Sequence, residues 1–188
     1  NQTFTITPNV GYHIADVLVD NVTVGAVTSY SFTNVTANHS IAASFAINTY
    51  TLTAAAGPNG SMNPSGVTNV NYGDNQSYAI SPSPGYHTAD VLVDNVSVGA
   101  VTSYSFNNVT ANHTISASFA ILSYSLNITI VGSGSVAKAP DQATYDHGTV
   151  VSLTATPVIG WTFAGWSGDA TGPANPLNVT MDAAKNIT

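Results

Sequence analysis

Pairs of aspartates spaced four residues apart are the first candidates for chemistry in this sequence. Asp16 and Asp20 form one pair, and Asp90 and Asp94 form the same pair later in the chain. Residues four apart in a β-strand face the same side, and Ca²⁺ is bound by carboxylates together with loop carbonyls. Neither pair lies in a run of alternating aspartates typical of a calcium loop, and Asp20 and Asp94 also suit the turn of a β-hairpin. We therefore predict no metal site.

The histidines recur with the sequence around them, as His13 and His87 and as His39 and His113. None belongs to a His-Glu-x-x-His pattern or has a clustered second ligand, so a transition-metal site is not expected. Serine is abundant, but no Gly-x-Ser-x-Gly context marks a nucleophile. The chain has no glutamate, which removes half of the usual acid–base carboxylates. We expect no catalytic residue, no cofactor and no enzymatic activity.

The glycosylation pattern Asn-X-Ser/Thr, with X not proline, occurs twelve times. Glycans on exposed turns would hydrate an almost uncharged surface. Alternatively, a sequence rich in Asn, Ser and Thr generates the pattern by chance, and repetition multiplies it. Six of these asparagines lie in predicted turns and are the candidate sites: Asn21, Asn34, Asn38, Asn95, Asn108 and Asn112.

Four aromatic residues, Tyr12, Tyr86, Trp161 and Trp166, offer a surface on which sugar rings could stack. The first three each follow a turn of the type Pro-x-x-Gly, and an aromatic in that place more often packs into the core of a small module. Both interpretations remain open for Trp166, which is the candidate glycan contact.

A repeat of about 74 residues positions all of these side chains. Residues 1–48 align with residues 75–122, and 36 of the 48 positions are identical. We predict a partial repeat without its front strands at 1–48, a complete repeat at 49–122, and a divergent repeat without its last strand at 123–188. The period is too long for a solenoid coil and fits small modules in tandem. No Pro/Gly/Ser linker separates the repeats, so hinge freedom at the joints should be limited.

Alternation of apolar and polar residues predicts an all-β (mainly β) fold with no substantial helix. Asp94-Asn95 has the residue types of a two-residue hairpin turn. The strands expected in the second and third repeats are Tyr50–Ala54, Ser77–Ser81, Ala89–Val93, Val96–Val98, Ser103–Phe106, His113–Ala120, Tyr124–Ile130 and Val150–Ala155.

The surface chemistry excludes several classes of partner. Only 6% of the residues are charged, against roughly 25% in an ordinary soluble domain. The net charge is −7, and Lys138 and Lys185 are the only cations, so neither nucleic acid nor anionic lipid is an expected partner. The apolar runs are too short to span a bilayer. This composition suits a secreted protein at the cell surface.

The last third of the chain resembles the divergent internalin-B (InlB) B-repeat family, a Listeria–Bacteroides type of bacterial surface repeat. The resemblance rests on an ordered series of segments: Tyr124–Ile130, Gly132–Val136, Pro140–Tyr145, Gly148–Pro157, Gly160–Asp169 and Asn175–Asp182. The first two repeats look like a sister version that lacks the Gly-Trp-Ser-Gly-Asp segment. The resemblance implies small β-modules, β-grasp-like or β-sandwich-like, in tandem on secreted or surface-anchored proteins. It implies no catalytic residue.

Two functions fit these observations. The modules could form an extracellular stalk or filament, or they could be adhesin-type binding modules for polysaccharide or a surface protein. The sequence begins and ends inside modules, which fits either an excerpt of a longer repetitive chain or a subunit completed by its neighbours. In the second case, neighbouring repeats or identical subunits would associate head to tail by strand donation.

Overall fold

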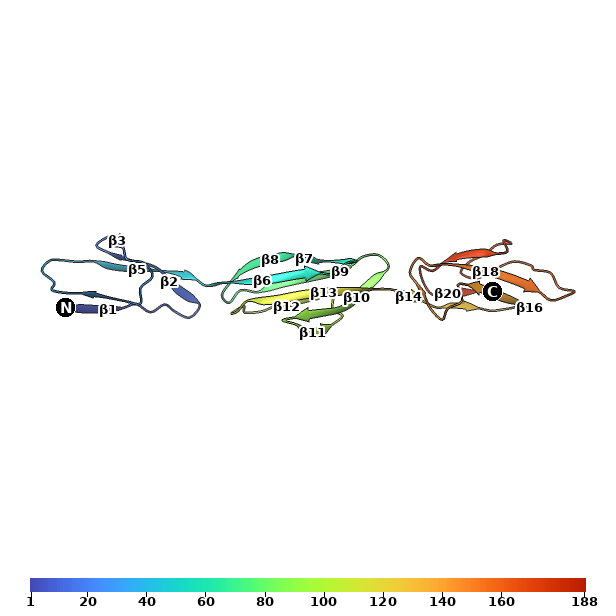
Figure 1. The fold of residues 1–188 in the computed structure, drawn as a ribbon, viewed down its shortest axis with the longest axis horizontal. Helices are drawn as coiled ribbons and strands as arrows, with labels where there is room; N and C mark the ends of the chain where they lie inside the picture. Colours follow the sequence, from blue (N-terminus) through green and yellow to red (C-terminus); the bar gives the residue numbers. More distant parts are fainter. The chain divides into compact units, whose positions relative to one another are not determined.

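The computed structural model describes all 188 residues and consists of strands and their connections, without a helix (Figure 1). The predicted all-β fold is confirmed. No helix is present that is long and apolar enough to cross a membrane. The chain divides into two compact units, one of residues 1–56, 62–80 and 90–117 and the other of residues 57–61, 81–89 and 118–188.

The middle repeat contains the most strands. Its eight strands are β6 (Thr49–Ala56), β7 (Gly60–Asn63), β8 (Gly66–Asn71), β9 (Gln76–Pro82), β10 (Tyr86–Val93), β11 (Val96–Gly99), β12 (Ser103–Phe106) and β13 (His113–Ile121). They form a five-stranded sheet in the order β11-β10-β13-β6-β8 and a three-stranded sheet in the order β12-β9-β7. Strand β13 runs parallel to β6, with His113 opposite Leu52.

Alternation in these strands explains the core of the middle repeat. Leu52 from β6, Tyr78 from β9 and Ile115 from β13 are buried, while their neighbours along each strand face solvent. The rings of Tyr78 and Phe106 meet edge to face with centroids 6.0 Å apart. The predicted hairpin is also confirmed, because Val93 pairs with Val96 across a turn. Asp94 and Asn95 in that turn have φ of 50° and 65°.

The first repeat has five strands: β1 (Gln2–Thr5), β2 (Tyr12–Val19), β3 (Val22–Thr23), β4 (Ser29–Phe32) and β5 (Ile41–Ile47). The pair β1-β4 corresponds to β9-β12, and the sheet β3-β2-β5 corresponds to β11-β10-β13. Strand β5 pairs with β2 along one edge, whereas its counterpart β13 lies between two strands.

The third repeat is built from seven short strands: β14 (Ser123–Tyr124), β15 (Leu126–Ile128), β16 (Gly134–Ala139), β17 (Tyr145–Asp146), β18 (Val150–Pro157), β19 (Leu177–Thr180) and β20 (Lys185–Ile187). Strand β20 runs parallel to β15 with Lys185 opposite Leu126, the register of His113 opposite Leu52. Its core consists of Leu126, Tyr145, Val151, Leu153, Trp166, Val179, Met181 and Ile187.

The predicted strand Tyr124–Ile130 is wrong in its extent. The structure has two short strands there, because Tyr124 pairs with β17 while Leu126–Ile128 pairs with β20. A change of partner within a few residues breaks one ladder into two. Strands β7, β8, β16, β17 and β19 were not predicted, and neither was β20, because the third repeat was expected to lack its last strand.

Candidate functional site: the joint between repeats

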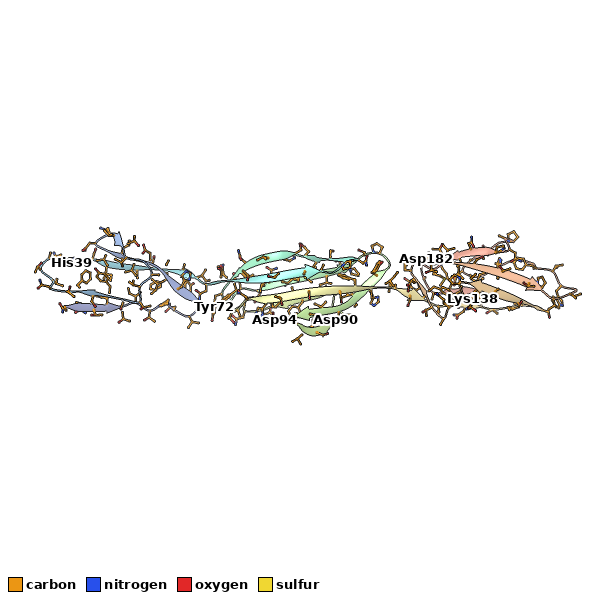
Figure 2. All side chains as sticks on the ribbon, viewed as in Figure 1. His39, Tyr72, Asp90, Asp94, Lys138 and Asp182 are labelled. Carbon is orange, nitrogen blue, oxygen red and sulfur yellow. The ribbon has the colours of Figure 1, made fainter.

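The carboxylate of Asp94, a residue labelled in Figure 2, ties the β10–β11 hairpin turn to the start of β13. Its Oδ2 lies 2.7 Å from Nδ1 of His113, and its Oδ1 accepts the backbone N–H of Thr114 at 2.8 Å. The hydrogen bond from His113, followed by that from Thr114, lowers the pKa of Asp94. The His113 ring stacks on Phe106 with centroids 5.0 Å apart. The arrangement, which we call the Asp–His clamp, therefore links the β10–β11 hairpin to β13 and, through the stacked ring, to β12.

The same clamp occurs in the first repeat. Asp20 lies 2.7 Å from His39 and accepts the N–H of Ser40 at 2.8 Å, and the hydrogen bond from His39 is the main cause of its lowered pKa. In the third repeat Oδ2 of Asp169 accepts the N–H of Asn186 at 2.6 Å, as the carboxylate of Asp94 accepts that of Thr114, and no histidine takes part. Lys185 stands at the register position of His113, and its Nζ lies 2.6 Å from Asp182. The hydrogen bond from Lys185 lowers the pKa of Asp182.

Within each aspartate pair, the two carboxylates form hydrogen bonds with different residues. Oδ1 of Asp90 accepts hydrogen bonds from the N–H of Val91 at 2.9 Å and the hydroxyl of Ser97 at 2.6 Å. Asp16 makes the matching bonds to Val17 and Thr23. These bonds hold β10 to β11 and β2 to β3. The carboxylates of Asp90 and Asp16 therefore act within their hairpins, unlike those of Asp94 and Asp20.

All six candidate glycosylation asparagines are exposed. Four of them, Asn21, Asn34, Asn95 and Asn108, adopt positive φ, which asparagine tolerates in turns. Modification at these sites stays a prediction. The side chain of Asn112 differs from its counterpart Asn38 in that its Oδ1 accepts the N–H of Thr51 at 2.8 Å.

Trp166 is only 6% exposed, and its indole N–H donates to the carbonyl of Ala174 at 2.7 Å. Its ring therefore offers little surface to a glycan, although a glycan contact there stays a prediction. Trp161 is 54% exposed and lines a groove of about 440 Å³, together with Phe163 and Trp166. Among the indoles, Trp161 presents the ring face that a sugar could reach.

The joint between the first two repeats is a backbone bridge through Asn48. Its N–H donates to the carbonyl of Gly11 at 2.8 Å, and its carbonyl accepts the N–H of Tyr72 at 2.8 Å. Gly11 has φ of 84°, and a Cβ at this position would overlap the ring of Tyr72. Nδ1 of His13 lies 2.9 Å from Oδ1 of Asn48. One residue is thus bonded to both repeats.

The joint between the second and third repeats uses the same bonds with different side chains. The N–H of Leu122 donates to Gly85 at 2.8 Å, and its carbonyl accepts the N–H of His147 at 2.8 Å. A Cβ at Gly85 would overlap the His147 ring. Tyr124 lies beside this ring with centroids 6.0 Å apart. The joint is therefore defined by backbone hydrogen bonds and by an aromatic ring that packs against a glycine.

Sequence reasoning placed the joints at residues 46–49 and 120–123, where Asn48 and Leu122 lie, but missed the glycines and rings that contact them. The available signal is that Gly11 and Gly85 occupy the same place in Pro-x-x-Gly turns. A second signal is that an aromatic residue precedes a positive-φ glycine at Tyr72-Gly73 and again at His147-Gly148. The Asp–His clamp was also missed, although its partners are 19 residues apart in both repeats.

Comparison with known proteins bears on the third repeat. Residues 124–188 match the family model of the divergent InlB B-repeat domain. This match confirms the resemblance predicted from the sequence over the last third of the chain. It indicates a bacterial surface repeat domain. No curated protein and no solved structure matches the chain.

Proposed function

We propose that this chain is a spacer segment of an extracellular stalk or filament, in which each repeat is fixed on the next by the joint. The observation that supports this function is the repetition of the joint. Asn48 and Leu122 differ in side chain, as do Tyr72 and His147, yet both joints make the same backbone bonds. A rigid connection that depends on backbone geometry suits a tandem array whose sequences diverge.

The joint restricts rotation for a simple reason. Strand β5 ends at Ile47 and β6 begins at Thr49, so Asn48 alone separates them. Its N–H and its carbonyl are both bonded, which fixes the peptide planes on either side. Flexible linkers need several unbonded residues, and none is present here. We therefore propose that the joint transmits bending forces from one repeat to the next.

Distance measurements between spin labels test this proposal directly. The chain has no cysteine, so Thr28→Cys with Thr102→Cys places one label on each of the first two repeats. The distance distribution should be as narrow as that of a control pair within the middle repeat, Thr53→Cys with Thr102→Cys. Adding Tyr72→Ala should broaden only the distribution across the joint. A broad distribution in the chain with the intact joint would contradict a stiff stalk.

A groove in the third repeat favours a second candidate function, adhesion to polysaccharide. The exposed ring of Trp161 borders the groove, and hydroxyls such as those of Ser135 and Thr156 line it. Aromatic faces flanked by hydroxyls suit sugar rings. Trp161→Ala should abolish any signal on a polysaccharide array, whereas Ile159→Ala, which is exposed and outside the groove, should not. An array without signal for the unaltered chain would rule this function out.

A further inference from the structure

The ring that packs against the glycine differs in chemistry between the two joints. In the first joint it is Tyr72 on Gly11, and in the second it is His147 on Gly85. The backbone hydrogen bonds of the two joints are the same. Histidine changes its charge between pH 5 and pH 8, whereas tyrosine ordinarily stays neutral up to about pH 10. Only in the second joint can the ring against the glycine gain a charge in mild acid.

The place that His147 occupies suits an uncharged ring. Its Nδ1 is buried and has no hydrogen-bond partner. The Cδ2 edge of the ring lies against Gly85, and the ring of Tyr124 lies beside it with centroids 6.0 Å apart. A proton on Nδ1 would create a charged N–H donor without an acceptor, and burying an unpaired charge is costly. The protonated ring is therefore expected to leave this place for solvent.

The neighbouring titratable groups do not compensate a charge on His147. The hydrogen bond from Lys185, at 2.6 Å, is the main cause of the lowered pKa of Asp182, and the charge of His147 contributes least. Solvent screens Asp146, which is exposed, and protonation of the exposed His87 would add charge of the same sign. The titratable side chains within two residues of the contact are Tyr86, His87, Tyr145 and Asp146.

We propose that the second joint is a pH switch, closed while His147 is neutral and loosened when its ring gains a proton. In the closed joint the ring lies on Gly85, and the N–H of the same residue donates to the carbonyl of Leu122 at 2.8 Å. Departure of the ring therefore weakens this backbone bond. Because the loosened joint binds a proton more readily than the closed one, the closed joint becomes less stable as the pH falls.

The first joint lacks this sensitivity. Its ring belongs to Tyr72, and its histidine, His13, is exposed with Nδ1 2.9 Å from Oδ1 of Asn48. A protonated imidazole can donate the same hydrogen bond to an amide oxygen, so acid does not break it. A stalk with both kinds of joint would become flexible in mild acid only where histidine stands. That consequence rests on the proposed function, whereas the pH dependence of the joint does not.

Amide hydrogen exchange on the full chain tests the switch. The N–H of His147 bonds to Leu122 as that of Tyr72 bonds to Asn48, so each amide reports on its own joint. Protection factors, corrected for the intrinsic effect of pH on exchange, are compared at about pH 7.5 and about pH 5. Protection of the His147 amide should fall by up to about thirtyfold, the factor by which a histidine of ordinary pKa favours its charged form at the lower pH. That of Tyr72 should change little.

Exchange of the two rings supplies matched controls. His147→Tyr places the ring type of the first joint in the second and should remove the pH response there. Tyr72→His leaves the second joint unaltered and should confer the response on the first. His87→Ala removes the exposed neighbouring histidine and should change nothing. The proposal is overturned by an unresponsive second joint, by equal responses at both joints of the unaltered chain, by a response that persists in His147→Tyr, or by none in Tyr72→His.

Spin-label distances separate the switch from the stalk. Thr102→Cys with Thr154→Cys, both at exposed positions, places labels on either side of the second joint. A broad distribution at about pH 7.5 would contradict the stiff stalk and leave the amide result standing. A narrow distribution at about pH 7.5 and about pH 5, with undiminished amide protection, would contradict the switch alone. Broadening at the lower pH, together with lost protection, supports both.

Discussion

At the scale of single residues, the Asp–His clamp makes the stability of the first two repeats depend on pH in the acidic range. The pKa of Asp94 lies below its ordinary value of 3.8 because His113 and Thr114 donate to the carboxylate. A group with a lowered native pKa stabilises the fold above its unfolded pKa and loses that contribution as the pH falls through the native value. The contribution is therefore present above the ordinary pKa of 3.8 and is lost as the pH falls below that value.

Asp94→Asn should reduce this acid dependence. The amide keeps an acceptor for Thr114 but carries no charge. The variant should therefore be less stable than the unaltered chain at pH 7, and the difference should shrink as the pH falls below 3.8. Thermal unfolding followed by circular dichroism at several pH values measures the effect. Asp74→Asn, which removes another exposed carboxylate, is the control. Parallel pH curves for the Asp94 variant and the unaltered chain would contradict the clamp.

The asparagines Asn38 and Asn112 form a matched pair for glycosylation. Both lie in the sequence Asn-His-Ser/Thr and both are exposed, but the side chain of Asn112 is held by Thr51. A transferase needs a mobile side-chain amide, so we expect higher occupancy at Asn38 than at Asn112 when the chain is secreted from a glycosylating host. Mass spectrometry of the two peptides measures the occupancies. Higher occupancy at Asn112 would refute this argument.

At the scale of elements, the joint can be probed through its glycines. Gly85 and Gly99 have nearly equal φ, 82° and 83°, but only Gly85 faces a ring, that of His147. Alanine at either position incurs about 1 kcal/mol of backbone strain, and overpacking at Gly85 adds about 1–3 kcal/mol. Gly85→Ala should therefore destabilise the chain clearly more than Gly99→Ala. Denaturant unfolding of the two variants measures this difference, and equal losses would show that the ring adapts.

The strands that sequence patterns predicted are those with strong alternation. Ser77–Ser81 and His113–Ala120 place large apolar residues on one face, and the structure confirms both as parts of β9 and β13. Strands β7 and β8 were missed because they are rich in Gly, Asn and Ser, and pairing with neighbours determines their conformation. The parallel register of β6 with β13 was equally hidden, since it joins segments that are far apart in sequence.

The joint likewise depends on contacts between distant segments, which sequence patterns do not reveal. The positive-φ glycines were visible as turn residues, but the aromatic ring that covers Gly11 belongs to Tyr72, in the following repeat. A single sequence carries no signal that relates a glycine in one module to a ring in the next. Two copies of the joint within one chain supply that signal once the structure has aligned them.

At the scale of the whole molecule, the three repeats should differ in stability. The first repeat leaves several large apolar side chains exposed that the middle repeat buries, among them Phe4 and Val35. Complete burial of a large side chain contributes about 1.5–3 kcal/mol, and Phe4 and Val35, which are 40% and 50% exposed, each forgo part of that contribution. Unfolding of the full chain should therefore not be two-state, and the first repeat should unfold first.

The positions of the tryptophans make this order measurable. Trp161 and Trp166 are the only tryptophans and both lie in the third repeat, so indole fluorescence reports on that repeat alone. Circular dichroism reports strand loss in all three. In urea, the loss of dichroism should begin at a lower concentration than the fluorescence change, and amides of β5 should exchange faster than those of β13. If the dichroism and fluorescence transitions coincide, the joints couple the unfolding of the repeats strongly enough to mask the lower stability of the first repeat.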